Sequence, residues 1–322
     1  MLKRPRRNRR SPAIRSLIEE TSLHPSDLAV PFFILPGTNK KSDIATLPQI
    51  QRLSIDHILK KAETLHQKGI QAILLFPCVP QEFKDPDGSF ALAENGILPT
   101  AIHAIKEKIP SLCVIADLAL DPYTSHGHDG LVNEKGEILN DQTVAQLCAA
   151  AHIYAQAGAD FIAPSDMMDG RVGAIRKKLD QHGLEHVGII SYTAKYASNL
   201  YRPFRDALDS APKFGDKKTY QLSFANVKEA LLEAKLDEEE GADILMVKPA
   251  LFYLDVIAKM RMSTHLPIAA YHVSGEYAMV MAAHEKGYLE APKVFLEALL
   301  SVKRAGADFI FTYAADQILN YL

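Results

Sequence analysis

The chain is poor in cysteine, in long apolar runs and in net charge. Its three cysteines, Cys78, Cys113 and Cys148, are widely spaced and odd in number, which fits buried thiols in a reducing cytoplasm better than a disulfide framework or a zinc site. No apolar run reaches the roughly 18 to 20 residues that a membrane span requires. The formal net charge of −3 provides no overall attraction to nucleic acid or to an anionic membrane. We therefore expect a cytoplasmic protein with neither a membrane nor a nucleic-acid partner.

Positive charge is concentrated near the N-terminus. Residues 3–10 (KRPRRNRR) form a block of like charge with a proline, and no apolar segment typical of a secretory signal follows it. Such a block is either a nucleic-acid-binding arm or a solvated segment that grips a neighbouring subunit. An RNA-retention assay after removal of residues 1–10 separates the two. Because the rest of the chain is mildly acidic, we favour the second alternative, and we predict an arm over residues 1–26 and one catalytic domain over residues 27–322.

The remainder of the chain alternates between apolar runs and segments of helical periodicity. Continuous apolar runs are typical of parallel strands covered on both faces, and they occur at 29–35, 71–76, 112–118, 159–164, 187–193, 242–248, 267–273 and 307–312. Helical patterns occur at 54–69, 141–157, 171–181, 225–240, 250–262, 276–286 and 292–304, and Gly-Ala-Asp recurs between helix and strand at 158–160, 241–243 and 306–308. This alternation predicts a (β/α)₈ TIM barrel. A Rossmann-like sheet is the alternative, but no Gly-x-Gly-x-x-Gly follows any strand.

Two of the predicted strands lead into a lysine: the run 242–248 ends at Lys248, and the run that begins at Val187 extends to Lys195. One such lysine alone is most simply a side chain that reaches solvent from a strand end. Two on neighbouring strands of a barrel would share one pocket, where burial and mutual repulsion lower an amine pKa. A neutral amine can attack a carbonyl and form a Schiff base. A single-lysine Schiff-base enzyme such as an aldolase is a rival interpretation, but this chain offers two lysines.

Polar residues, including these two lysines, lie at the carboxyl ends of the predicted strands, where the active site of a TIM barrel is expected. They are Asp117, Ser165, Asp166, Lys195, Lys248, Ser274 and Tyr313. Two connections, 119–140 and 196–224, are long enough to be lids. The second carries aromatic and cationic residues suited to a carboxylate substrate, namely Tyr201, Arg202, Phe204, Arg205, Lys213, Lys217, Lys218 and Gln221.

Several long motifs make the chain resemble the porphobilinogen synthase (5-aminolaevulinate dehydratase) family from about residue 5 to the end. They are 121–130 (DPYTSHGHDG), 164–171 (PSDMMDGR), 191–198 (SYTAKYAS), 203–207 (PFRDA), 246–249 (MVKP) and 273–277 (VSGEY). The resemblance implies condensation of two 5-aminolaevulinate molecules to porphobilinogen, an early step of tetrapyrrole (haem) biosynthesis, by a homo-oligomer that is typically an octamer.

The resemblance also assigns roles to residues. Lys248 and Lys195 would each form a Schiff base with one substrate. Arg205 and Lys217 would bind one substrate carboxylate, although the family usually has arginine where Lys217 stands. The remaining substrate contacts would come from Ser274 and Tyr313, on the second carboxylate, and from Asp117, Ser165, Tyr201, Phe204, Gln221, Asp121 and Asp129. Proton-handling candidates are Asp117 and the tyrosines Tyr192, Tyr201 and Tyr271.

The loop after Asp117 departs from the zinc-dependent members of the family, which carry three cysteines there. This chain has Ala119, Asp121 and Asp129 at those places, so no thiolate cluster selects zinc. The two aspartates could hold Mg²⁺ through water or bond the substrate amine. A zinc site at the nearby histidines, His126 and His128, is a less favoured alternative because their spacing matches no familiar ligand pattern.

Glu233 matches the carboxylate of an allosteric Mg²⁺ site in magnesium-responsive members of the family. The alternative is an ordinary exposed helix residue. The resemblance therefore implies Mg²⁺ as an allosteric cofactor and no zinc.

Overall fold

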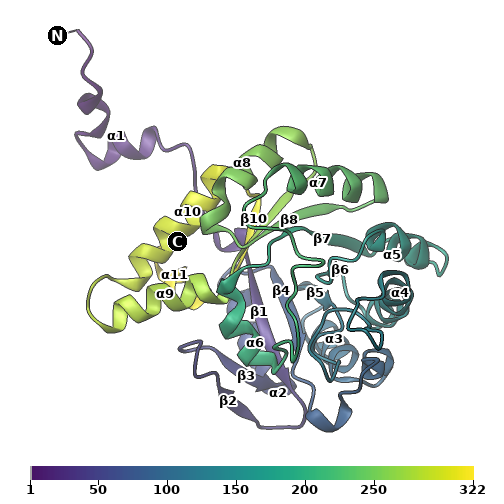
Figure 1. Ribbon diagram of the computed structural model, residues 1–322. Coiled ribbons are helices and arrows are strands. Elements are labelled where there is room, and N and C mark those ends of the chain that lie inside the picture. Colours follow the sequence, from purple (N-terminus) through teal and green to yellow (C-terminus); the bar gives the residue numbers. More distant parts are fainter. Residues whose placement is uncertain (1) are drawn as a thin grey trace.

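A closed barrel of eight parallel strands forms the body of the protein. The structure, a computed structural model, describes residues 2–322. Each barrel strand pairs with the next along the chain, and β10 closes the ring on β1 (Figure 1). The barrel strands are β1 (Leu28–Leu35), β4 (Ala72–Pro77), β5 (Cys113–Leu118), β6 (Phe161–Pro164), β7 (Gly188–Lys195), β8 (Ile244–Lys248), β9 (Ile268–His272) and β10 (Phe309–Thr312). All eight predicted strands, and with them the TIM barrel, are confirmed.

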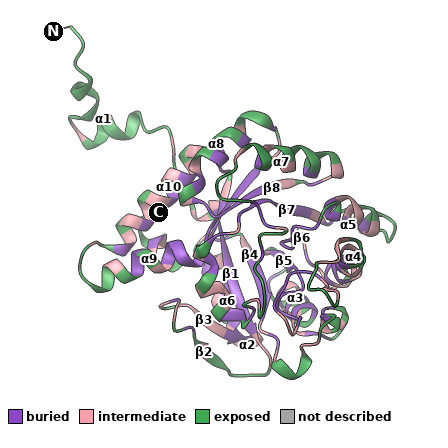
Figure 2. Ribbon diagram, viewed as in Figure 1, coloured by how far each residue is buried: buried purple, intermediate pink, exposed green. Residues whose placement is uncertain are grey.

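Helices cover the outside of the barrel, so the strands are apolar on both faces. Figure 2 shows buried strands inside a ring of helices whose outward faces are exposed. The helices are α2 (Ile55–Gln67), α3 (Ile97–Lys108), α4 (Asn140–Gln156), α5 (Arg171–Asp180), α7 (Lys228–Glu240), α8 (Leu254–Ser263), α9 (Ser274–Glu285), α10 (Ala291–Ala305) and α11 (Ala315–Ile318). The helix α3 was not predicted from the sequence.

The three Gly-Ala-Asp repeats join a helix to the strand that follows it. In each repeat the glycine has φ between 98° and 123°, a backbone conformation that residues with a Cβ rarely adopt. The aspartate carboxylate then accepts a hydrogen bond from an N–H near the start of the preceding barrel strand. The pairs are Asp160 with Val114, Asp243 with Ile189 and Asp308 with Ile268. The repeated motif therefore fixes neighbouring strands in register.

The strand β1 changes partners along its length. Near its start, Leu28 and Ala29 pair with β10, whereas Phe33–Leu35 pair with the added strand β3 (Gln51–Ser54). A further strand, β2 (Lys41–Asp43), runs antiparallel to β3. Neither added strand was predicted. Ser54 occupies the N-cap position of α2, and its hydroxyl donates to the Asp56 carboxylate at 2.6 Å instead of capping a backbone N–H.

The basic N-terminal segment stands away from the barrel in Figure 1. It contains a 3-10 helix (Pro5–Arg9) and α1 (Pro12–Leu17), neither of which has a buried residue. Met1, the first residue of the predicted arm, lies outside the described residues. Within residues 2–322, no helix has the length and apolar character to cross a bilayer.

Candidate active site

The two strand-end lysines lie side by side. Lys195 and Lys248 are register partners across the β7–β8 pair, and their exposed fractions are only 6% and 5%. They share one small cavity with most of the predicted site residues: Asp121, Asp129, Ser165, Tyr201, Phe204, Arg205, Lys217 and Gln221. The expectation that the two strand-end lysines share one pocket is therefore confirmed.

The amine of Lys248 is enclosed by aromatic rings. Its Nζ lies 4.4 Å from the ring centroid of Tyr271, 4.9 Å from that of Tyr192, 5.0 Å from that of Phe204 and 5.3 Å from that of Tyr201. These rings replace water around the amine without supplying a counter-charge. Burial, which disfavours the ammonium form, is accordingly the largest cause of a pKa lowered to about 7.

Lys195 provides the second cause of that shift, because its positive charge repels a proton on Lys248. The environment of Lys195 itself differs from that of Lys248. Its Nζ lies 3.4 Å from Asp129 Oδ2 and donates to the carbonyl of Ser165. The two lysines are therefore electrostatically distinct, one among aromatic rings and the other beside a carboxylate.

Asp129 is the centre of a buried ion-pair cluster. Its carboxylate accepts hydrogen bonds from Lys217 Nζ at 2.7 Å and from Gln221 Nε2 at 3.3 Å, in addition to its contact with Lys195. Burial alone would raise the pKa of Asp129, but the two lysines hold it well below its usual range. Lys217 thus neutralises a carboxylate in this structure, which the sequence did not indicate.

Two further carboxylates lie on the same side of the barrel mouth. Asp117 accepts a hydrogen bond from the Ser165 hydroxyl at 3.0 Å, and burial raises its pKa to about 7 against the opposing charges of the two lysines. Burial likewise raises the pKa of Asp121, whose carboxylate lies 3.8 Å from Lys217 Nζ. Asp117 can therefore carry a proton near neutral pH.

A short helix, α6 (Arg202–Leu208), covers the two lysines as part of the second long connection. Phe204 and Arg205 of this helix line the cavity, and the hydroxyl of Tyr201, just before it, donates to the carbonyl of Lys248 at 3.1 Å. The connection was predicted as a lid, although its helix was not recognised in the sequence.

Ser274 and Tyr313 lie next to the cavity but do not line it. The Ser274 hydroxyl accepts from the Phe204 N–H at 3.1 Å and donates to the Leu200 carbonyl. Tyr313 bonds the Tyr271 hydroxyl at 3.2 Å. Both residues therefore touch the walls of the site through Phe204 and Tyr271.

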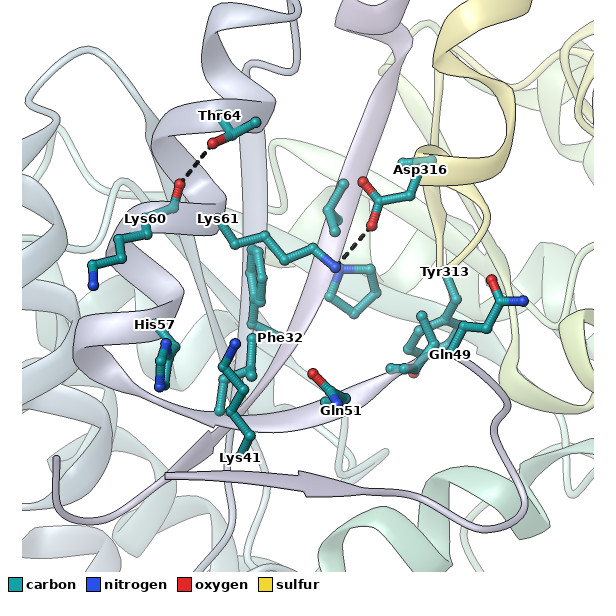
Figure 3. Close-up of a pocket in the computed structure, with 15 residues that line it drawn as sticks. Phe32, Lys41, Gln49, Gln51, His57, Lys60, Lys61, Thr64, Tyr313 and Asp316 are labelled. Atoms are coloured by element: carbon teal, nitrogen blue, oxygen red, sulfur yellow. Dashed lines mark hydrogen bonds and ion pairs between the residues drawn. The ribbon is translucent and has the colours of Figure 1, made fainter. Parts of the chain in front are cut away.

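Tyr313 also borders a separate cavity of about 300 Å³ between β1, β3 and α2 (Figure 3). Lysine side chains surround this cavity, and one of them, Lys61, forms an ion pair with Asp316 at 2.7 Å. None of the strand-end lysines lines it. It is therefore distinct from the cavity that contains Lys195 and Lys248.

Glu233 lies on α7, outside the barrel mouth. It borders a cavity of about 710 Å³ together with Glu229 and Asp169. Burial, followed by repulsion from Asp237, raises the pKa of Glu233 to about 7. The shift marks a carboxylate that is partly removed from water and lies beside other carboxylates.

The two histidines of the first long connection bond to neighbouring loops. His126 Nε2 lies 3.0 Å from the Pro86 carbonyl, and His128 Nε2 lies 3.0 Å from the Phe214 carbonyl. Across residues 2–322, no three His, Cys, Asp or Glu side chains converge in an arrangement that could hold a metal ion.

Sequence reasoning missed several residues that support the site. Tyr220 bonds His128 Nδ1 at 3.1 Å and the Asp129 N–H at 3.4 Å, which ties the first lid to the second. The buried Arg171 donates to the Tyr192 carbonyl at 3.2 Å, directly behind the ring that faces Lys248. The only signal in the sequence is that Tyr220 adjoins Gln221 and that Arg171 ends a recognised motif.

A (β/α)₈ barrel with two buried lysine amines at its carboxyl-terminal mouth, under a short helix, defines the class of TIM-barrel enzymes. The family model described as delta-aminolevulinic acid dehydratase matches residues 2–321. The delta-aminolevulinic acid dehydratase of Chlamydia pneumoniae is 54% identical over 99% of this chain and 96% of that protein. The chloroplastic enzyme of Glycine max is 52% identical over 99% of this chain and 78% of that protein.

A solved structure agrees with these relatives. The delta-aminolevulinic acid dehydratase (porphobilinogen synthase) of Toxoplasma gondii ME49, in complex with its reaction product porphobilinogen, superposes with a TM-score of 0.97. It is 49% identical and covers 100% of this chain and 92% of that chain. The chain belongs to the delta-aminolevulinic acid dehydratase family. It is a lyase of tetrapyrrole biosynthesis.

Proposed function

We propose that this chain condenses two molecules of 5-aminolaevulinate to porphobilinogen through Schiff bases on Lys248 and Lys195. The observation that carries the proposal is the amine of Lys248, enclosed by four aromatic rings beside a second lysine, with a pKa lowered to about 7. An ordinary lysine, with a pKa near 10.4, is almost entirely protonated at neutral pH, whereas Lys248 is about half neutral. Its lone pair is therefore available for attack on a ketone carbon.

Each Schiff base forms in two chemical steps, addition of the amine and loss of water. The neutral amine adds to the ketone carbon of one substrate, and the resulting carbinolamine loses its oxygen as water. Asp117, with a pKa near 7, is placed to donate the proton that this oxygen requires. Joining the two bound substrates and releasing the pyrrole regenerates both lysines, so two substrates yield one porphobilinogen and two waters.

Substrate carboxylates would be held from the lid and from the opposite wall. Arg205 on α6 and Lys217 would bind one carboxylate, and Ser274 and Tyr313 the other. Lys217 already lies 2.7 Å from Asp129, so it would share its charge between that carboxylate and the substrate. Tyr201, Phe204, Ser165, Asp121 and Gln221 would complete the cavity wall.

We further propose that Mg²⁺ binds at Glu233 as an allosteric cofactor. Four carboxylates, from Glu137, Asp169, Glu229 and Glu233, border one wide polar cavity. As in the rest of the described chain, they do not converge as a direct ligand set, so Mg²⁺ would keep most of its waters and contact Glu233 and its neighbours through them. The raised pKa of Glu233, caused first by burial and then by repulsion from Asp237, supports this placement because a cation would stabilise the charged carboxylate. Mg²⁺ there would stabilise the assembled form of the enzyme. Asp121 and Asp129 would instead serve the substrate, because both face Lys217.

The basic arm over residues 1–26 would bind a neighbouring copy of the barrel, which residues 27–322 form. The assembly would be a homo-oligomer of eight subunits, as the resemblance to the family implies. Apolar side chains in its outer part are left uncovered, with Leu2 95% and Leu17 84% exposed. The outer face of α7 offers both exposed leucines, Leu232 and Leu236, and acidic residues for its arginines. Charge complementarity and exposed apolar surface on both sides support this assignment.

The activity is tested directly by incubating the purified chain with 5-aminolaevulinate and assaying porphobilinogen colorimetrically. We expect product from the wild type and none from Lys248→Met. Lys61→Met is the matched control, because Lys61 is a half-buried lysine in the separate cavity of Figure 3 and should leave turnover near the wild-type rate. Product formation by Lys248→Met at the wild-type rate would disprove the assignment.

A further inference from the structure

The cavity around the two lysines is too small in this structure to hold a substrate. Its volume is about 20 Å³, which is room for roughly one water and not for an amino-acid-sized substrate. Phe204 and Arg205 of α6 form part of its wall. Substrate entry therefore requires α6 to move, and the contacts that hold α6 in place control how often the closed form is populated.

The last carbonyls of α6 and the residue after it are bonded by two cations from outside the lid. Arg52 donates through Nη2 to the Asp206 carbonyl at 2.7 Å and through Nε to the Ala207 carbonyl at 2.6 Å. Lys84 Nζ donates to the next two carbonyls, those of Leu208 at 3.2 Å and Asp209 at 2.7 Å. Terminal helix carbonyls lack intrahelical donors and carry the negative end of the helix dipole, so cations stabilise them.

Both cations are anchored on the barrel. Arg52 lies in β3, which pairs with β1, and its Nη1 also bonds the Ser42 hydroxyl and the Asp43 carbonyl of β2, each at 3.3 Å. Lys84 follows β4, and burial lowers its pKa despite the opposing charge of Asp209. The added strands β2 and β3, which lie outside the barrel ring, thus hold a cation against the lid.

The opposite end of α6 is bonded through residues of the site itself. The Ser274 hydroxyl accepts from the Phe204 N–H, and the Tyr201 hydroxyl donates to the Lys248 carbonyl. At the C-terminal end of α6, in contrast, the bonding side chains include Arg52, Lys84 and Thr46, the last through the Asp206 carboxylate, and none of the three lines the cavity. A change at Arg52 or Lys84 therefore affects the closed position of α6 without removing any group that lines the cavity.

We propose that Arg52 and Lys84 form a cationic latch that holds α6 closed over Lys195 and Lys248. They are positioning residues that act on substrate through Phe204 and Arg205. The inference rests on the proposed function for its kinetic consequence, because Arg205 binds a substrate carboxylate only when α6 is closed.

The test combines steady-state kinetics with hydrogen exchange of the substrate-free enzyme. Arg52→Ala and Lys84→Ala should each raise KM for 5-aminolaevulinate about tenfold, equivalent to ~1.4 kcal/mol, with kcat changed much less. Amides of residues 202–210 should exchange faster in both variants. Arg52→Lys, which keeps the charge but loses the planar fork, should recover part of the KM effect. Lys41→Ala, which removes an exposed cation from β2, is the matched control and should change neither quantity.

Wild-type KM and wild-type exchange in both alanine variants would overturn the latch, as would a fall in kcat without a change in KM or exchange. If Arg52→Ala does not fold, Lys84→Ala decides the outcome, because its side chain reaches α6 from a loop. Failure of the wild type to form porphobilinogen would instead refute the proposed function. The hydrogen-exchange measurement uses no substrate, so it would still test whether Arg52 and Lys84 hold α6 closed.

Discussion

The charge of Lys195 should set part of the reactivity of Lys248, and a substitution can measure how much. Parallel strands lie about 5 Å apart, and Lys195 and Lys248 are register partners. Two unit charges at about 5 Å interact by roughly 3 kcal/mol at an effective dielectric constant of about 20. This equals about two pH units, and the contact of Lys195 with Asp129 should reduce the effect to between about one and two.

Lys195→Met removes this charge and leaves the aromatic rings around Lys248 intact. Because the neutral amine is the reactive form, the rate of Schiff-base trapping rises as pH passes through the pKa. The half-maximal rate should lie near pH 7 in the wild type and between about pH 8 and 9 in Lys195→Met. At pH 7 the variant should be trapped on the order of ten times more slowly. Cyanoborohydride reduction with 5-aminolaevulinate, followed by mass mapping of the Lys248 peptide, measures the rate.

Lys195→Arg is the matched control, because it keeps the positive charge but does not form a Schiff base. Its Lys248 trapping profile should stay near that of the wild type. Identical profiles for Lys195→Met and Lys195→Arg would refute the electrostatic coupling. A wild-type midpoint above pH 9 would refute the larger claim that the aromatic rings desolvate Lys248.

Three further predictions concern the carboxylates and the arm. Asp129→Asn leaves two lysines without their buried counter-charge, so urea unfolding should show a loss of roughly 3 kcal/mol. Because the pKa of Asp129 is lowered in the folded state, the difference in stability between wild type and Asp129→Asn is fully present above about pH 4. It fades as pH falls through the folded pKa. Equal stabilities of the two proteins at pH 7 would contradict this prediction. Glu233→Ala should abolish stimulation of turnover by Mg²⁺, and a retained ratio of rates with and without Mg²⁺ would remove Glu233 from that role. Deletion of residues 1–26 should lower the sedimentation mass and the activity; an unchanged mass would show that the arm does not join subunits.

The barrel could be predicted from the sequence because each of its strands is buried on both faces. A strand such as β8 is a continuous apolar run that ends in Lys248, and it needs no knowledge of its partners to be recognised. The strands β2 and β3 were missed because they are short and depend on a neighbouring strand to form. They are three and four residues long, and β3 exists because β1 leaves an edge open beyond its pairing with β10. This open edge of β1 arises from the closure of the barrel, so it cannot be recognised from residues 41–54 alone.

The candidate site, like the fold, was predicted only in part from the sequence. Lys195 and Lys248 were placed correctly because barrel topology brings strand ends together. The pairing of Lys217 with Asp129 joins two lids 88 residues apart in the chain, and no local pattern encodes it. The bonds of Arg52 to α6 span 154 and 155 residues and depend on the path of a lid that was predicted without its helix. Sequence pattern thus located the two lysines but not the side chains that neutralise and position the groups around them.

Covalent trapping of Lys248 tests the central claim most directly. The wild-type enzyme is reduced with borohydride while it turns over 5-aminolaevulinate, and the peptides that carry Lys195 and Lys248 are analysed by mass spectrometry. The account predicts that Lys248 acquires the mass of a reduced substrate adduct. Recovery of the Lys248 peptide entirely unmodified from enzyme that is producing porphobilinogen would contradict it.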